Sequence, residues 1–247
     1  MEDREKMPEV EIKAKSRFLT KLENYWYHYK WHTIIAGIAA IILIVCMWQV
    51  NTTKKHDVII VYAGPNCLST TEIKELEEII NAALPYDKDG NGDKSAAMSM
   101  YQIYSAEQIE KQNAETDATG AHMTVDTSRN TEQYSAYNSY MMTGSSSICF
   151  LDPWLYEQTL SNSQGSYIRP LYEVFGEGNL PKGSLEDGYG VRLGDTDFYK
   201  NNEVVQRLNP DTVVCFRSSH ILGQSSNDKH YQYEEAVFRA LLTYQSE

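Results

Sequence analysis

The longest run of apolar residues lies near the start of the chain and predicts a helix that crosses a membrane. Residues 33–48, TIIAGIAAIILIVCMW, carry no charge, and at about 1.5 Å per residue they extend about 24 Å. Aromatic residues flank the run, YWYHYKWH at 25–32 and Trp48, where amphipathic rings favour the membrane interface. With these flanks the segment matches a hydrocarbon core of about 30 Å. We therefore expect a transmembrane anchor at 32–50; a buried core helix is the alternative, but core helices rarely run this long without a polar break.

From residue 57 onward, β-rich runs alternate with helical patterns. Strands are predicted at 57–64, 95–105, 146–152 and 211–218, with a shorter β-like run at 189–195. Helices are predicted at 69–84, 106–115, 127–144, 153–160 and 231–244. Ser69 and Glu72 form the sequence pattern of a capping box at the first of these helices. Strands that alternate with helices of this length predict one α/β domain at 57–247 with a largely parallel sheet.

The basic residues around the apolar segment predict its orientation. Seven Lys and Arg residues precede the segment, whereas only Lys54 and Lys55 follow it closely. The richer side stays in the cytoplasm, so we expect a cytoplasmic leader at 1–31 and the α/β domain outside the plasma membrane. A cleaved signal peptide fits less well, because the charged leader is long and no A-x-A-like site follows the run. Lipoprotein processing at Cys46 is disfavoured by the bulky Val45 before it.

Charge and cysteine usage narrow the classes of partner. The net charge of −12 argues against nucleic acid, since binding a phosphate backbone needs a basic face. The four cysteines contain no CxxC pair, which disfavours a structural zinc site. Cys67, Cys149 and Cys215 follow the anchor in apolar surroundings, and we expect three buried, reduced thiols.

The stretch DKDGNGDKS at 87–95 has the spacing of a calcium loop. Asp87, Asp89 and Asn91 would supply ligands one, three and five, Gly92 the sharp turn, and Asp93 a backbone carbonyl. The twelfth position, which supplies a bidentate carboxylate in such loops, is a methionine. The favoured interpretation is therefore a solvated turn, with a weak extracellular calcium site as the alternative.

Other chemistry-bearing patterns are sparse. Tyr137 and Trp154 could stack on a sugar or a peptide, with Asp152 beside them as a hydrogen-bond acceptor; the alternative is that the aromatic residues belong to the core. The sequence contains no HExxH, P-loop, Rossmann glycine pattern or GxSxG elbow. We therefore predict a protein that is not an enzyme and that has no cofactor, with the weak calcium site at 87–93 as the alternative.

Several short motifs follow one another in a familiar order. A helix ends in MMTGSSS, a strand with an aspartate closes on the helix PWLYEQTL, and YIRPLYEVFG leads to EDGYGVRLGD. This order resembles the first lobe of extracellular solute-binding proteins of ABC importers, and the chain is similar to singly anchored surface proteins of clostridia-like Gram-positive bacteria. The matching positions are Gly144, Phe150, Asp152, Pro170, Leu171, Tyr189, Gly190 and Val191. The resemblance implies a one-lobe, solute-binding-protein-like α/β domain.

These observations lead to two predicted functions. The first is a membrane-anchored, extracytoplasmic binding or scaffold protein that docks to a protein of the cell envelope and catalyses nothing. The alternative is a solute receptor that binds a sugar or a peptide for uptake or sensing through Tyr137, Asp152 and Trp154. In both cases the expected partners are membrane lipid around the anchor and an envelope protein, with a small-molecule ligand left open.

Overall fold

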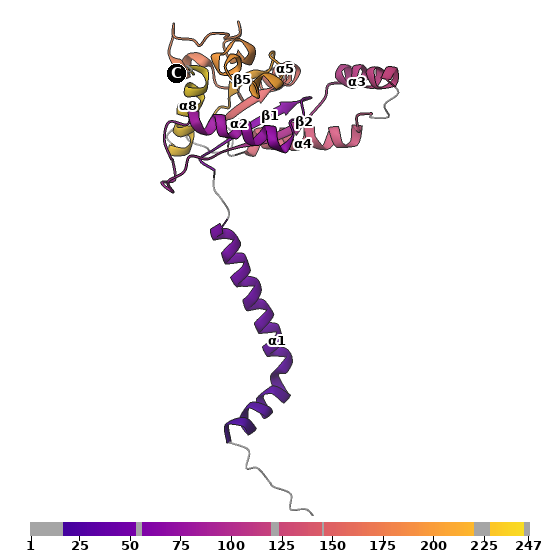
Figure 1. Cartoon of the computed structure of the whole chain (residues 1–247), viewed down its shortest axis with the longest axis vertical. Helices are drawn as coiled ribbons and strands as arrows, with labels where there is room; N and C mark the ends of the chain where they lie inside the picture. Colours follow the sequence, from indigo (N-terminus) through magenta and orange to yellow (C-terminus); the bar gives the residue numbers. More distant parts are fainter. Residues whose placement is uncertain (1–16, 53–55, 120–123, 145, 220–227, 245–247) are drawn as a thin grey trace, which may run out of the picture. The chain divides into compact units, whose positions relative to one another are not determined.

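The computed structural model describes residues 17–52, 56–119, 124–144, 146–219 and 228–244 (Figure 1). The chain divides into two compact units, Met1–Lys54 and Lys55–Glu247. Residues 1–16 of the predicted leader lie outside the described residues.

The described part of the first unit is one helix, α1 (Arg17–Thr52), of 36 residues. At about 1.5 Å per residue it extends about 54 Å, and its stretch Leu22–Gln49 is long and apolar enough to cross a membrane. The helix continues through the predicted boundary between leader and span at residue 32. It bends in its N-terminal part (Figure 1). Thr33 Oγ1 donates to the carbonyl oxygen of Tyr29 at 3.0 Å, and side-chain bonds of this kind often bend helices.

The second unit contains a five-stranded mixed sheet with the order β2-β1-β3-β5-β4. Its strands are β1 (Val58–Gly64), β2 (Ala96–Gln102), β3 (Ile148–Leu151), β4 (Gly190–Arg192) and β5 (Val213–Phe216). β1 pairs in parallel with β2 and with β3, but β5 pairs antiparallel with both β3 and β4. The prediction of an α/β domain is confirmed. The sheet is mixed: β4 runs in the same direction as β1, β2 and β3, and β5 alone runs against them. The reversal arises in the connection between β4 and β5, residues 193–212, which contains only short helical turns and no long crossover helix that would keep the strands parallel.

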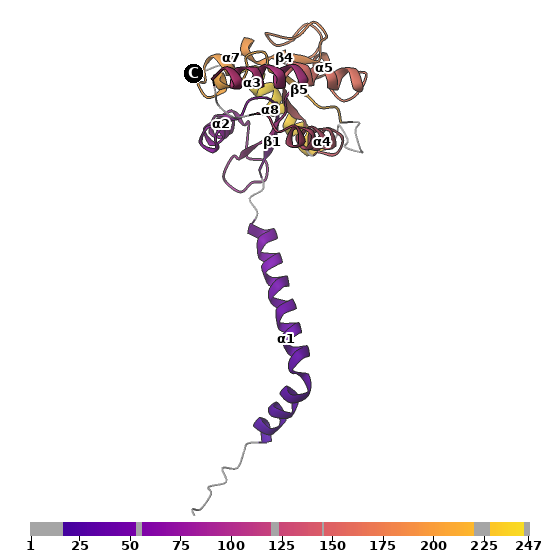
Figure 2. The same ribbon diagram turned by 90° about the vertical axis from the view of Figure 1, so that its right-hand side faces the viewer.

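Helices cover both faces of the sheet. Alternate residues of β1 point to opposite faces, so Ile60 and Tyr62 join a core with α2 (Thr70–Ala83), α6 (Leu171–Phe175), α7 (Asp197–Lys200) and α8 (Lys229–Leu242). Val61 and Ala63 join a second core with α4 (Thr127–Thr143) and α5 (Pro153–Asn162). Figure 2 shows α2 and α4 on opposite sides of β1. Burial on both faces explains why the sequence of β1, VIIVYAG, is apolar throughout.

Local signals in the sequence fix several helix starts. The capping box of α2 is confirmed, with Ser69 Oγ and the Glu72 carboxylate each accepting from the other residue's backbone amide. Asp126 caps α4 and Asp152 caps α5, which carries Pro153 in its first turn. The remaining elements are α3 (Ala106–Thr119) and the 3₁₀ turns η1 (Leu193–Asp195) and η2 (Val205–Arg207).

The expectation of three buried thiols holds for two cysteines. Cys149 and Cys215 are buried opposite each other on β3 and β5. Cys67 is exposed, so its predicted burial is wrong. It lies in the connection between β1 and α2, and connections run over the surface because their backbone needs water or side-chain partners.

Two buried charged side chains lie behind the amino ends of β1 and β3. Arg217 donates to the carbonyl oxygens of Ser146 (3.0 Å), Met141 (3.3 Å) and Gly144. These bonds tie the end of α4 to the sheet, since the last carbonyls of a helix have no intrahelical donors. Glu234 of α8 is fully buried and lies 3.6 Å from His230 Nε2.

Candidate functional site

The carboxyl ends of β1, β2 and β3 meet at one edge of the sheet, called the carboxyl edge below. β2 and β3 lie on opposite sides of β1, and in α/β proteins ligands bind in the crevice outside the strands at such a point. Backbone bonds join the loops there: Asp152 N donates to Ala63 O at 2.8 Å, and Ile103 N donates to Gly64 O at 3.0 Å. The carboxyl edge is therefore a rigid platform for side chains in the loops that follow the strands.

Asp152 lies at the centre of the carboxyl edge, directly after β3. Its carboxylate accepts from Trp154 N (3.1 Å) and from Gln108 Nε2 of α3 (3.1 Å). Burial raises the pKa of Asp152, although these two hydrogen bonds oppose the shift. The side chain is almost fully buried, so it joins α3 to the start of α5 and turns little of its surface toward a solute.

The other two residues of the predicted solute site, Tyr137 and Trp154, are buried and half-buried, respectively. Tyr137 is buried, and its hydroxyl lies 2.8 Å from Thr159 Oγ1. Trp154 is half-buried and packs against Tyr134 with ring centroids 6.1 Å apart. A cavity of about 30 Å³ beside Tyr137 is lined by neither Asp152 nor Trp154. Because this space suits about one water molecule, the structure does not bring the three residues together around a solute.

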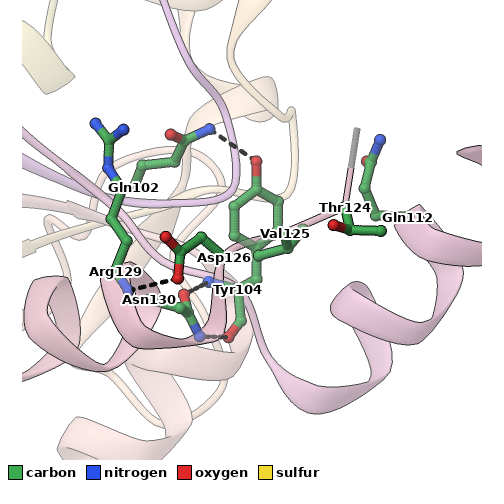
Figure 3. A pocket seen from close by; sticks show the side chains of 8 residues that line it. All are labelled: Gln102, Tyr104, Gln112, Thr124, Val125, Asp126, Arg129 and Asn130. Atoms are coloured by element: carbon green, nitrogen blue, oxygen red, sulfur yellow. Dashed lines mark hydrogen bonds between the residues drawn. The ribbon is translucent and has the colours of Figure 1, made fainter. Parts of the chain in front are cut away.

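A larger, polar cavity lies beyond the carboxyl end of β2, called the β2 pocket below (Figure 3). Its volume of about 330 Å³ falls in the range of small-molecule sites, about 300–1,000 Å³. The end of β2, α3 and the start of α4 supply its lining: Gln102, Tyr104, Gln112, Thr124, Val125, Asp126, Arg129 and Asn130.

Hydrogen bonds position the first wall of the β2 pocket. The side-chain amide of Asn130 accepts from Tyr104 N (2.8 Å) and donates to Tyr104 O (3.0 Å), which fixes the backbone of Tyr104 against α4. Gln102 Nε2 donates to the Tyr104 hydroxyl at 2.7 Å. The hydroxyl accepts that bond, so its own proton remains for another acceptor.

The second wall is held by the start of α4. Asp126 Oδ1 accepts from Ser128 N (2.9 Å) and Arg129 N (3.2 Å) as the helix cap. Val125 N donates to Asn113 Oδ1 of α3 at 3.3 Å, which links the two helices. Figure 3 shows the guanidinium of Arg129 beside the side chain of Gln102, with Gln112 and Thr124 across the Tyr104 ring.

The lining indicates binding chemistry. Amides, hydroxyls, one guanidinium and one carboxylate can donate to and accept from a small polar molecule. These groups suit hydrogen bonding to a small polar solute.

Residues 87–95, called the acidic turn, lie at the end of the sheet opposite to the carboxyl edge. The carboxylate oxygens of Asp87 and Asp89 lie within 4.8 Å of one another and of an oxygen of Asp57, a residue that sequence reasoning missed. Asp57 is buried and accepts from Lys88 N (3.1 Å), Asp89 N (3.3 Å) and Ser95 N (2.9 Å). Asp57 therefore holds the backbone of the turn whether or not an ion is present.

The predicted ligands of the acidic turn fulfil local roles. Asp87 accepts from Gly90 N (2.8 Å) and Gly92 N (2.7 Å), and Asn91 Oδ1 accepts from Asp93 N (2.8 Å). The amide of Gly92, more than that of Gly90, lowers the pKa of Asp87. Asp57, Asp87 and Asp89 offer the hard oxygens that calcium prefers, and calcium binding stays a prediction.

Sequence reasoning did not single out the residues of the β2 pocket. One signal was present: Gln102 and Tyr104 lie at the carboxyl end of the predicted strand 95–105, where α/β ligand sites form. The opposite wall comes from 112–130, and no local pattern in that stretch shows that it folds back onto β2.

Comparison of the chain with protein-family models, with curated proteins and with solved structures found no match. The resemblance to one lobe of a solute-binding protein stays a prediction.

Proposed function

We propose that this chain is a membrane-anchored receptor whose α/β domain faces away from the cytoplasm and holds a small polar solute, a sugar or a short peptide, in the β2 pocket. The observation that carries the proposal is the polar cavity of about 330 Å³ at the carboxyl edge of the sheet. The receptor binds its solute without transforming it.

The construction of the β2 pocket supports this role. Tyr104 and Gln102 are held by hydrogen bonds before any solute arrives, so little side-chain freedom is lost on binding. The ring of Tyr104 offers a face for a sugar ring or a peptide plane, and the surrounding amides and hydroxyls match the polar groups of either solute.

The position of the receptor follows from α1. The helix is long and apolar enough to cross a lipid bilayer, which supports an anchor, and the excess of Lys and Arg before it favours a cytoplasmic N-terminus. The pocket would then sample solutes outside the cytoplasm. Docking to an envelope protein, the first function predicted from the sequence, stays a prediction.

A thermal-shift panel tests the proposal on the full chain in detergent. The wells contain monosaccharides, oligosaccharides, amino acids and short peptides, and calcium or chelator tests the acidic turn separately. A solute at about one hundred times its dissociation constant adds about 2.7 kcal/mol to the free energy of unfolding, which raises Tm by several degrees. We expect at least one solute class to produce such a shift.

Tyr104→Phe is the diagnostic variant. It removes the hydroxyl that accepts from Gln102 and can donate its proton to a solute, and it should abolish most of the solute-dependent shift. Tyr172→Phe is the matched control, because Tyr172 is an exposed tyrosine of α6, and it should leave the shift intact. A flat panel, or a shift that Tyr104→Phe leaves unchanged, would contradict the proposal and favour a protein partner.

A further inference from the structure

Charge is distributed unevenly among the lining residues of the β2 pocket. Arg129 is the one basic residue of the eight and Asp126 the one acid. Oδ1 of Asp126 accepts from two backbone amides at the start of α4, and the positive end of the helix dipole offsets part of its charge. Arg129 therefore contributes the charge that remains for a ligand.

The guanidinium of Arg129 has no carboxylate within ion-pair distance among the residues that the structure describes. The side chain is exposed and extends along the Gln102 side of the pocket (Figure 3). A guanidinium offers a planar fork of donors that matches the two oxygens of a carboxylate. An unpaired arginine in this position is suited to an anionic, planar group.

Two neighbouring groups also have protons to donate. The Tyr104 hydroxyl accepts from Gln102 Nε2, so its proton is free, and the same Gln102 amide has a second N–H. Together with Arg129 they form a donor-rich corner of the pocket. A carboxylate accepts hydrogen bonds without donating any, so it satisfies this corner better than a hydroxyl or an ammonium does.

We infer that the solute held in the β2 pocket carries a carboxylate, bound by Arg129 and by the donors of Tyr104 and Gln102. The inference rests on the proposed function and names the class of solute: an acidic sugar such as a uronate, or a short peptide with a free C-terminus. The chain as a whole is acidic, which does not steer anions toward it, so selectivity comes from the contacts inside the pocket.

Isothermal titration of the full chain in detergent with matched probes tests the inference. D-glucuronate is compared with D-glucose, and alanyl-alanine with alanyl-alanine amide, so that each pair differs in its carboxylate. We expect the charged member of at least one pair to bind about tenfold more tightly, because charge-assisted hydrogen bonds are stronger than neutral ones. The pair that responds distinguishes a sugar acid from a peptide terminus.

Variants separate this inference from the proposed function. Arg129→Gln should remove the preference for the charged probe, and Arg192→Gln is the matched control, since Arg192 is exposed and lines no part of the β2 pocket. The inference would be overturned if both members of each pair bound equally well and if Arg129→Gln left that binding unchanged. If Tyr104→Phe still weakened the binding, the receptor proposal would stand. Binding of no probe of either pair, with a flat thermal-shift panel, would overturn both.

Discussion

Asp57 shows how one buried carboxylate organises a loop. Its carboxylate accepts hydrogen bonds from three backbone amides of the acidic turn. Each is a charge-assisted bond that a neutral side chain replaces poorly. Asp57→Asn should lower the free energy of unfolding by about 3 kcal/mol. Asp93→Asn, in the exposed part of the same turn, should change it by less than about 0.5 kcal/mol. Urea unfolding of both variants checks the prediction, and equal losses would contradict it.

Glu234 and Glu235 are neighbours whose contributions to stability change with pH in opposite directions. Burial raises the pKa of Glu234 from 4.5 to about 7, against the effects of Ser147 and Arg217. The folded state then keeps a proton that the unfolded state loses above pH 4.5. The contribution of Glu234 to stability therefore falls between pH 4.5 and 7, by about 3 kcal/mol at one pKa unit per 1.36 kcal/mol.

Glu235 behaves in the other direction. Partial burial opposes the shift, but hydrogen bonds from Arg239 and Arg169 lower its pKa below 4.5. Its contribution to stability is present above pH 4.5 and is lost as pH falls through the lowered pKa.

The two glutamates give a matched pair of variants. Glu234→Gln should raise stability at pH 8 and flatten the decline between pH 4.5 and 7, whereas Glu235→Gln should lower stability at pH 8. Denaturant unfolding as a function of pH separates the two, and a pH profile unchanged by Glu234→Gln would refute the assignment.

At the scale of elements, one buried arginine secures the end of a helix. Arg217 of the segment after β5 donates to carbonyls at the end of α4 and at Ser146. Lysine has fewer donors and lacks the planar fork, so Arg217→Lys leaves buried carbonyls unpaired and should cost about 3 kcal/mol. Arg239→Lys, at a more exposed arginine of α8, should cost less than about 1 kcal/mol. A small loss for Arg217→Lys in urea unfolding would show that these bonds are replaceable.

Two helices of equal length should differ in local stability. α2 and α3 each have 14 residues, but α2 buries Leu76 and Ile80, whereas residues 106–115 of α3 are exposed or half-buried. Helical stability in proteins comes mainly from packing of an apolar face. Amides of 106–115 should therefore exchange hydrogen at least tenfold faster than those of α2. Mass spectrometry of exchange checks this, and equal protection would mean that α3 has support beyond its own contacts.

The elements also show how far sequence reasoning extends. Apolar strands buried on both faces, such as 58–64, and capped amphipathic helices, such as α2, are local patterns and were predicted. The direction of β5 depends on the path of the turn-rich segment before it, so the mixed sheet was missed. The helix at 231–244 was predicted, but the buried Glu234 on α8 was not expected.

The β2 pocket was missed for a related reason. Its lining comes from the end of a strand and from two helices, and each residue type is ordinary on a surface. Only the packing of α3 and α4 beside β2 brings Arg129 next to Gln102. By contrast, Tyr137 looked like a ligand-stacking residue and lies in the core, because aromatic residues serve both purposes.

The whole molecule joins an apolar helix to an α/β unit that has its own two-sided core. All residues of that core belong to the second unit. The helix would then serve to locate the receptor, and the side of the membrane on which the α/β unit lies decides which solutes it meets. The receptor proposal depends on the side of the membrane on which the α/β unit lies more than on any single hydrogen bond of the β2 pocket.

Labelling of native cysteines in intact cells tests directly whether the α/β unit lies outside the cytoplasm. Cys67 is exposed on the α/β unit, whereas Cys149 and Cys215 are buried and react slowly while the domain is folded. Cys46 lies in the apolar stretch of α1, where lipid would shield it from a polar reagent. A membrane-impermeant maleimide should therefore label the chain in intact cells, and Cys67→Ser should abolish the labelling. Labelling of Cys67 only after the membrane is permeabilised would place the domain in the cytoplasm and contradict an outward-facing receptor.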